Sequence, residues 1–285
     1  MKKVMLTLLW GLSALVLCTS CSENNDQITE PNSVEQTAET PWSKSVPKNV
    51  IEAATKLDLN VDHLRYDTFY FPDGTSEERL FIEEDIVMTE QEILALAKFT
   101  DGRQYATNNL VSQGRNISII GYTGFLYGLS SKERNALSMA VNNYNSLSGV
   151  SISFTLTFGT NYQNKDMVVY RNPFQFGSGG SAGFPNNGLP HKWVQIYGLS
   201  SYNVDVIEHV ITHEIGHSVG FRHTDWFSRE SCGQNTNEGD AGVGANHING
   251  TPTGYDATSI MLSCFHSGVN GEFNSNDITA LQAMY

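Results

Sequence analysis

Basic side chains are scarce in this chain of 285 residues. There are 17 lysines and arginines against 30 aspartates and glutamates, and the formal net charge is −13. Nucleic-acid surfaces need clustered lysine and arginine to neutralise phosphates. The acidic balance therefore argues against a nucleic-acid partner and favours a globular protein that carries a local site.

The chain also lacks an apolar run long enough to span a bilayer. The apolar run Val4–Leu17 follows Lys2 and Lys3 and has the length of the hydrophobic region of a signal peptide. This segment predicts export from the cytoplasm rather than a transmembrane helix.

Only four cysteines are present, and two of them lie at the end of this segment. Cys21 follows small residues and precedes a polar stretch, an arrangement that resembles the lipobox of bacterial lipoproteins. We therefore predict that residues 1–21 are a lipoprotein signal peptide and that Cys21 carries the lipid. Cys18 is a weaker candidate, and an ordinary signal peptide cut nearby is the alternative. The protein is expected outside the cytoplasm, lipid-anchored to a bacterial membrane, at the outer membrane or the cell surface.

Cys232 and Cys264 remain after the signal segment. In an oxidising compartment an isolated cysteine pair is typical of a disulfide. Two metal ligands are the alternative, but the pair forms no CxxC motif and a better ligand set lies elsewhere. The disulfide is the preferred interpretation.

The length leaves room for one larger domain and a smaller companion. Residues 22–48 are polar and contain prolines, which predicts a flexible tether. The patterns that follow divide into a small α+β unit over residues 49–112 and a larger α+β domain over residues 113–285.

The small unit has few elements. They are a helix over residues 50–57, a hairpin around Asp73-Gly74 with arms over 68–71 and 80–82, and a helix opened by Thr89. Glu92 stands three residues after Thr89, as in a capping box. The unit is interpreted as a pro-region or a structural subdomain, and it contains no cysteine whose thiolate could block a metal.

The larger domain mixes strand and helix patterns. Strands are expected over residues 116–122, 151–158, 167–170 and 194–197, and helices after Ser130, over 204–219 and over 275–285. Between two of these strands, residues 177–190 are rich in glycine, asparagine and proline. This stretch is expected to be too polar for the core and long enough to be functional.

The segment that carries chemistry is HEIGHSVGFRH, residues 213–223. Two histidines four residues apart on a helix lie on one face, about 6 Å apart, so His213 and His217 can meet one metal ion. Gly220 permits a positive φ at which the helix can stop and the chain reverse. His223 can then return as a third ligand, which leaves the fourth coordination position for water.

Glu214 projects about 100° round the helix from the first histidine, beside the metal rather than onto it. A carboxylate in this position can act as general base for a zinc-activated water. We therefore predict one catalytic Zn²⁺ held by His213, His217 and His223, with Glu214 as the catalytic base.

Other histidines fit less well. His209 shares the helix face of His213 but lies too far along the helix to share its ion, so we expect it behind the ligands or exposed. His247 and His266 are rival third ligands, yet neither has the turn that Gly220 provides.

The pattern HExxHxxGxxH followed by a methionine resembles the signature of the metzincin clan of zinc peptidases. More narrowly, residues 104–285 resemble the bacterial dual-action HEIGH metallopeptidases. The matching segments are Tyr144-Asn145, His213–Asp225, Cys232-Gly233, His247–Pro252, Ser259–Cys264 and Phe273–Tyr285.

This resemblance implies an α+β fold with a metzincin-type zincin catalytic domain, preceded by the small N-terminal pro-region or subdomain. Such a domain has a twisted, mostly parallel five-stranded sheet, an active-site helix, a Met-turn and a C-terminal helix. Ser259-Ile260-Met261 resembles the Met-turn, whose methionine underlies the zinc site. Asp277 resembles an aspartate that supports this turn, with a helix N-cap role as the alternative.

Some positions depart from better-known metzincins. Thr224 follows the last ligand, where those families have Ser, Glu, Asp or Pro. Ser263 stands where astacin-like enzymes place a zinc-binding tyrosine, so no fifth ligand is expected. Asp225 is left with three roles: pairing with Arg222, hydrogen bonding to His223, or pairing at the surface.

The site and the resemblance predict a secreted zinc-dependent endopeptidase. Its substrate would be a protein or peptide bound as an extra strand along a sheet edge near residues 180–185, for which a plain surface loop is the alternative. Residues 262–268 would form the wall of a side-chain pocket. The alternative functions are a surface binding module with structural zinc and a metal-dependent amidase acting on a non-protein substrate.

Two further expectations concern assembly and a second ion. We expect a monomer whose membrane contact is the lipid anchor alone. Calcium is considered for the loop over residues 234–250, but nothing there matches a defined calcium loop.

Overall fold

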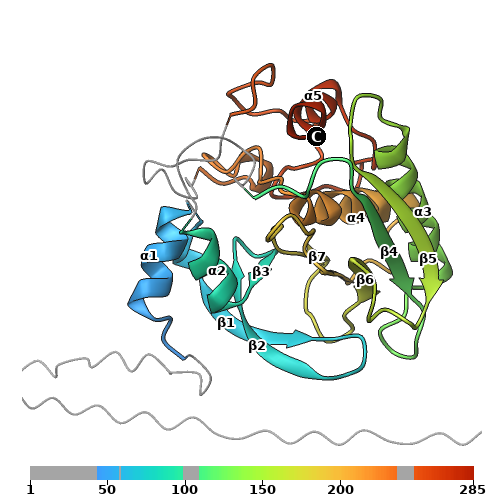
Figure 1. Cartoon of the computed structure of the whole chain (residues 1–285), viewed down its shortest axis with the longest axis horizontal. Coiled ribbons are helices and arrows are strands. Elements are labelled where there is room, and N and C mark those ends of the chain that lie inside the picture. Colours follow the sequence, from blue (N-terminus) through green and yellow to red (C-terminus); the bar gives the residue numbers. More distant parts are fainter. Residues whose placement is uncertain (1–43, 58, 99–108, 236–246) are drawn as a thin grey trace, which may run out of the picture. The chain divides into compact units, whose positions relative to one another are not determined.

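The structure is a computed structural model that describes residues 44–57, 59–98, 109–235 and 247–285 (Figure 1). These residues lie within one compact unit, Pro41–Tyr285. The predicted signal segment, the lipidation site Cys21 and most of the 22–48 tether are outside the described residues, as is most of the loop considered for calcium. Within the described ranges, no helix has the length and apolar character needed to cross a membrane.

The N-terminal part is a three-stranded antiparallel sheet with two helices. Its elements are α1 (Lys48–Lys56), the 3-10 turn η1 (Val61–His63), β1 (Arg65–Tyr70), β2 (Ser76–Ile82), β3 (Ile86–Met88) and α2 (Glu90–Leu96). Apolar side chains from both helices, β2 and β3 form one buried cluster, including Val50, Leu80 and Ile93. Phe184 of the larger part also belongs to this cluster, so the core of the N-terminal part is continuous with its neighbour.

Two local signals of the sequence are confirmed here. The hairpin between β1 and β2 turns at Asp73-Gly74, and Gly74 has the positive φ of 87° that favours glycine. Helix α2 begins after Thr89, whose hydroxyl accepts the Glu92 N–H while the Glu92 carboxylate accepts the Thr89 N–H. Both signals are local contacts, which a short sequence pattern can specify.

The larger part is built on a five-stranded sheet with the order β5-β4-β6-β8-β7. Its strands are β4 (Asn116–Tyr122), β5 (Ser153–Gly159), β6 (Met167–Arg171), β7 (Gly179–Ser181) and β8 (Trp193–Tyr197). Strands β4, β5, β6 and β8 pair in parallel, whereas β7, at one edge, pairs antiparallel with β8. The expected mostly parallel five-stranded sheet is confirmed.

Helices complete this part: α3 (Ser131–Ser146), α4 (Val204–Ser218) and α5 (Ser275–Met284), with a 3-10 turn η2 (Glu230–Cys232). Each α-helix begins after a side-chain cap, at Ser130, Asn203 and Asn274 respectively. Tyr144 of α3 donates its hydroxyl to the Thr212 carbonyl of α4 at 2.9 Å. This bond ties α4, which carries the histidine motif, to its neighbour.

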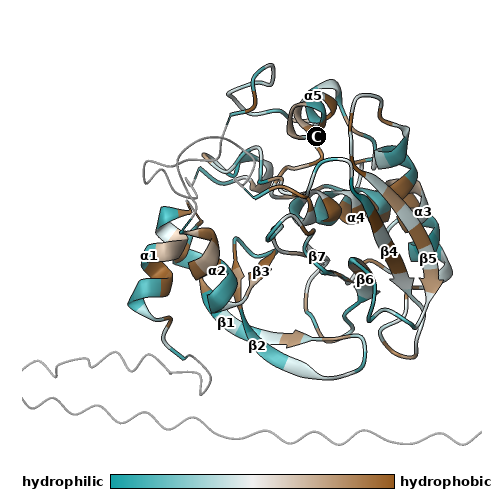
Figure 2. Cartoon of the chain, in the orientation of Figure 1, coloured by the Kyte–Doolittle hydropathy of each residue, from teal (hydrophilic) through white to brown (hydrophobic). Residues whose placement is uncertain are grey.

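The two faces of the five-stranded sheet have different covers. Met167 and Val169 belong to a core shared with α3 and α4, while Val168 and Tyr170 pack in a second cluster with Phe69 of β1. The alternation follows from the strand period of two. The β1–β2 hairpin therefore covers the sheet face opposite α3 and α4. Along β5 in Figure 2, brown segments alternate with pale ones, as the strand period predicts.

The expectation of a polar loop over residues 177–190 is wrong in part. Residues 179–185 are buried, and three of them form the edge strand β7. A Cβ built at Gly180 would lie 2.5 Å from Cγ of Glu214 on α4. The glycine here allows strand and helix to approach closely, a role that composition alone does not distinguish from that of a loop glycine.

A disulfide joins Cys232 to Cys264 and so connects η2 to the segment beyond Met261. The two sulfurs are bonded to each other, which leaves neither available as a metal ligand. The link fixes two irregular segments that have little regular secondary structure to hold them.

Replacing both cysteines by serine should lower the free energy of unfolding by about 3–4 kcal/mol, because the bond closes a long loop in the unfolded chain. Urea unfolding under non-reducing conditions measures the change. The parent protein in the presence of reductant should show the same loss. Superimposable curves for the oxidised parent and the double variant would contradict the prediction.

Candidate metal centre and active site

Helix α4 carries the first two histidines of the motif on one face. The ring centroids of His213 and His217 lie 4.6 Å apart. The helix ends at Ser218, and Gly220 has a φ of 111° where the chain turns back. The ring centroid of His223 then lies 4.9 Å from that of His217 and 5.3 Å from that of His213. The structure thus brings the three predicted metal-binding histidines together.

Backbone carbonyls fix the orientation of two of these rings. Nδ1 of His213 lies 2.9 Å from the Ile260 carbonyl oxygen, and Nδ1 of His217 lies 2.9 Å from that of Phe221. A ring that donates its Nδ1–H in this way keeps a lone pair on Nε2. Among the described residues, the buried Nε2 of His217 has no hydrogen-bond partner, and burial lowers the pKa of His217 to about 3. The ring is therefore neutral, as metal binding requires.

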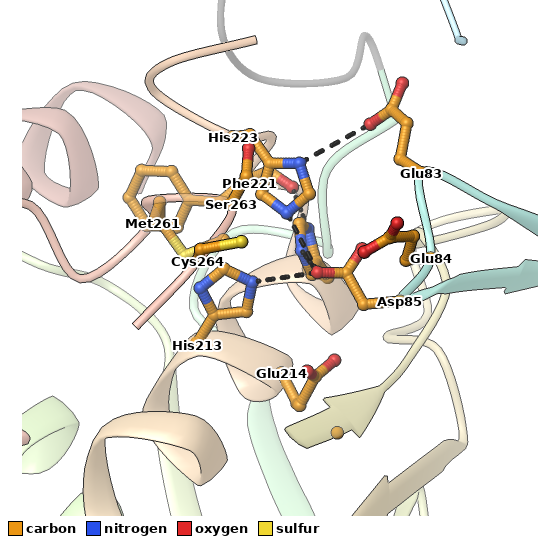
Figure 3. Close-up of polar contacts among 12 residues, drawn as sticks. Glu83, Glu84, Asp85, His213, Glu214, Phe221, His223, Met261, Ser263 and Cys264 are labelled. Carbon is orange, nitrogen blue, oxygen red and sulfur yellow. Dashed lines mark hydrogen bonds and ion pairs between the residues drawn. The ribbon is translucent and has the colours of Figure 1, made fainter. Parts of the chain in front are cut away.

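A carboxylate completes the cluster (Figure 3). Asp85 lies between β2 and β3, and its Oδ2 is 3.0 Å from Nε2 of His223. The same oxygen is 3.5 Å from Nε2 of His213 and 3.9 Å from Nε2 of His217. One ligand atom from each of the four side chains lies within 4.8 Å of the others. The sequence prediction missed Asp85, since its run of three acidic residues matches no ligand motif.

The turn between β2 and β3 directs Asp85 to the histidines. Glu83 and Glu84 have positive φ angles of 52° and 76°, which residues with a Cβ rarely adopt. The buried Glu83 carboxylate pairs with Arg222 at 2.8 Å, one residue before the third histidine. After the turn, the Ala182 N–H donates to the Asp85 carbonyl at 2.9 Å. A buried ion pair and a backbone bond therefore hold the turn on either side of Asp85.

These donors fit a zinc ion. Three imidazole nitrogens and one carboxylate oxygen are a four-ligand set of the kinds that zinc accepts. A metal would also give the buried Nε2 of His217 the partner that it lacks among the described residues. The cluster is therefore compatible with a metal site.

Glu214 lies on the same helix, outside the four-residue cluster (Figure 3). Its side chain packs against Gly180 of the edge strand, and its buried Oε2 forms no hydrogen bond within the described part of the chain. Burial, together with the negative charge of Asp85, raises the pKa of the Glu214 carboxyl well above its usual range. This position, next to the cluster rather than in it, is the one that the helix spacing predicts.

Met261 supports the cluster from the side of the C-terminal segment. It is fully buried, and a Cβ built at Gly216 of α4 would lie 2.5 Å from its sulfur. The Met261 carbonyl accepts the N–H of Thr224 at 2.9 Å, directly after His223. This turn therefore contacts both the helix and the returning chain that carry the histidines.

Asp277 of α5 supports the turn before Met261, whereas the N-cap role considered for it belongs to Asn274, with Asp277 as the third helical residue of a capping box. Its Oδ1 accepts the Ser259 hydroxyl at 2.8 Å and its Oδ2 accepts the Ile260 N–H at 3.1 Å. The Asn274 N–H donates to the same Oδ2 at 3.0 Å, which caps the helix. Burial raises the pKa of Asp277 to about 6.

Asp225 has a different role from those expected. It is fully buried and accepts hydrogen bonds from the backbone N–H and hydroxyl of Ser231 and of Ser263. A surface ion pair is therefore wrong, and Arg222 pairs with Glu83 instead. These four hydrogen bonds to one carboxylate fix the loop between the third histidine and the disulfide.

The other histidines lie outside the four-residue cluster. His209 is buried, its Nδ1 lies 2.8 Å from the Asn270 carbonyl oxygen, and burial lowers its pKa to about 4. His247 contacts the Thr251 carbonyl, and His266 is exposed.

A cleft of about 250 Å³ opens beside the cluster. Its lining includes Gly180 of β7, His213 and Glu214 of α4, and Leu262 and Phe265 beyond Met261. Residues from the segment expected to form a pocket wall therefore do line the space next to Glu214. The cleft could accept part of a polypeptide close to both the cluster and the carboxylate.

Comparison with known proteins bears on this geometry. A family model described as dual-action HEIGH metallo-peptidase matches residues 80–285. The chain is similar to two solved structures of myroilysin. One has 13% identity, covers 62% of this chain and 82% of that chain, and has a TM-score of 0.39. The other has 14% identity, covers 62% and 86%, and has a TM-score of 0.40. Among curated proteins, no match was found.

The parallel-rich sheet, the histidine-bearing helix and the family match define a metalloendopeptidase. Because the family model matches well over half of its residues, the chain belongs to the dual-action HEIGH metallo-peptidase family.

Gly216→Ala should lower the free energy of unfolding by about 1–3 kcal/mol, because the new methyl would overlap the Met261 sulfur. It should also weaken metal binding, since the displaced turn supports His213 through the Ile260 carbonyl. Urea unfolding and metal content after dialysis test both effects. Gly254→Ala is the matched control, because a Cβ there meets nothing within 4 Å. Equal behaviour of the two variants would contradict the prediction.

Proposed function

We propose that this metallopeptidase is a zinc-dependent endopeptidase in which Glu214 is the general base. The observation that carries the proposal is the convergence of three histidines, two held through Nδ1 by backbone carbonyls, next to a buried glutamate that is not part of the cluster. When bound, zinc would lower the pKa of a bound water and polarise the scissile carbonyl.

The role of Glu214 follows from its surroundings. A carboxylate with an unbonded oxygen beside the cleft can accept a proton from the attacking water and deliver it to the leaving amine. Burial raises the pKa of the Glu214 carboxyl, which favours the uptake of a proton by this side chain. Close packing against Gly180 limits the orientations that the side chain can adopt.

The substrate would lie as an extended strand along the edge at β7. Two features support this position: β7 is the outermost strand of the sheet, and Ala182 just beyond it already exchanges backbone hydrogen bonds with residues 85 and 87. Main-chain pairing of this kind tolerates varied side chains. Selectivity would come from the cleft, where Tyr202, Val210 and Phe265 offer apolar surface for one substrate side chain beside polar lining residues.

We also infer that the enzyme acts outside the cytoplasm, anchored through a lipid on Cys21. The apolar run after Lys3 and the lipobox-like sequence support this proposal. The Cys232–Cys264 disulfide supports it independently, because such bonds persist in oxidising compartments.

Glu214→Gln should reduce the rate of casein cleavage by about 10²–10⁴-fold while metal content is unchanged, because the carboxylate moves protons and does not hold the ion. The Asp85 carboxylate lies among the histidines, where it would compete with water for the metal. The cleavage rates are therefore compared in a background without it, between Asp85→Ala and Asp85→Ala/Glu214→Gln. Glu208→Gln is the control on the same helix, because Glu208 bonds Asn143 away from the cluster. Equal cleavage by Asp85→Ala with and without Glu214 would contradict the assignment.

Zinc itself is tested by metal removal. The protein as isolated should contain about one zinc per chain. Dialysis against a chelator should abolish cleavage by Asp85→Ala, and added zinc, but not magnesium, should restore it. Full activity in the metal-free protein would exclude the mechanism.

A further inference from the structure

We propose that residues 44–98 are an internal inhibitor of the peptidase, with the Asp85 carboxylate as a fourth metal ligand that must leave before a substrate can be hydrolysed. The inference rests on the proposed zinc peptidase function. It goes beyond that function because it assigns a regulatory role to a segment and a carboxylate outside the histidine motif.

Asp85 occupies the position that a catalytic site keeps open. Catalytic zinc sites have three protein ligands and a fourth position for water or substrate, whereas sites with four protein ligands are structural. Oδ2 of Asp85 lies within 3.0–3.9 Å of Nε2 of all three histidines. With this oxygen on the ion, Glu214 has no metal-bound water to deprotonate.

The same segment also blocks the edge at which a substrate strand would pair. The Ala182 N–H donates to the Asp85 carbonyl at 2.9 Å, and the Val87 N–H donates to the Ala182 carbonyl at 2.6 Å. Ile86 and Ala182 form a parallel bridge. The side chains of Glu84 and Asp85 line the cleft that contains Glu214. One short stretch of chain thus fills the metal position, the sheet edge and part of the cleft.

Packing and charge hold the segment in this place. Phe184, two residues beyond the bridge, belongs to the apolar cluster formed by α1, α2 and the small sheet, and its ring lies 5.9 Å from that of His217. The buried pair between Glu83 and Arg222 anchors the turn itself. The inhibitory contact is therefore part of a packed interface and not a single flexible carboxylate.

An internal ligand of this kind lowers the apparent affinity for any other ligand. A competitor binds only the fraction of molecules from which the carboxylate has left, so its apparent dissociation constant rises in inverse proportion to that open fraction. The attached chain also keeps the carboxylate at a high effective concentration beside the ion. Removal of the carboxylate should restore access without removing the metal, since three histidines remain.

The test uses the full chain loaded with Co²⁺, whose visible absorption reports ligand exchange, and acetohydroxamate as the probe. Asp85→Asn keeps the side-chain shape and removes the anionic ligand, and Asp85→Ala removes it altogether. Asp62→Ala, an exposed aspartate in the same segment, is the control. Thermal unfolding confirms that each variant is folded before spectra and casein cleavage are measured.

We expect both Asp85 variants to keep about one cobalt and to bind acetohydroxamate about tenfold or more tightly than the parent and Asp62→Ala. Casein cleavage by the zinc form should rise by a similar factor. Tighter binding without cleavage would support the inhibitory ligand and contradict the peptidase function. Loss of the metal from Asp85→Asn would make Asp85 a permanent structural ligand and overturn the inference. Unchanged acetohydroxamate affinity with the metal retained would overturn it as well.

Discussion

The site depends on imidazole rings that are turned so that their Nε2 atoms converge. A helix alone cannot achieve this, because it fixes only the positions of His213 and His217 and not the rotation of their rings. The rotation is set by two carbonyls, one from the turn before Met261 and one from the chain just past the helix. Each ring is thereby held in one tautomer with its metal-binding nitrogen inward. The Met261 turn, its support by Asp277 and the reversal at Gly220 all serve this orientation.

The N-terminal part of the described chain is built into the enzyme rather than appended to it. Its β1–β2 hairpin covers one face of the central sheet, where Phe69 packs with Tyr170 in one buried cluster. At its other end, the turn after β2 reaches the histidines and the edge strand. A segment with both contacts stabilises the fold and lies against the site through the same packing. In the proposed inhibitory role, release of the site requires this interface to open at least around Asp85.

The sequence was sufficient for the parts of the molecule that depend on local spacing. The clustering of the three histidines of the motif, the capped helices and the hairpin at Asp73-Gly74 follow from contacts within a few residues, and the structure has each of them. The mostly parallel sheet and the turn at Met261 were predicted instead from the resemblance to a family. Composition predicted a polar loop at residues 179–185, which are buried. Glycine in a buried strand and glycine in a loop give the same pattern of residue types.

What the sequence could not provide were contacts between distant segments. Asp85 and His223 are far apart in the chain, and an acidic run after a strand is most often a solvated turn. The positive φ angles of Glu83 and Glu84, which aim the aspartate inward, have no signal in residue type, since neither residue is glycine or asparagine. Asp225 likewise bonds Ser231 and Ser263, partners that only the folded loop brings to it.

The most direct test of the central claim is a crystal structure of the full chain with anomalous data at the zinc absorption edge. The account predicts one zinc peak among His213, His217 and His223, with an Asp85 oxygen as the fourth ligand at about 2.0–2.2 Å. A zinc peak elsewhere, or one among the three histidines with Asp85 turned away, would contradict it.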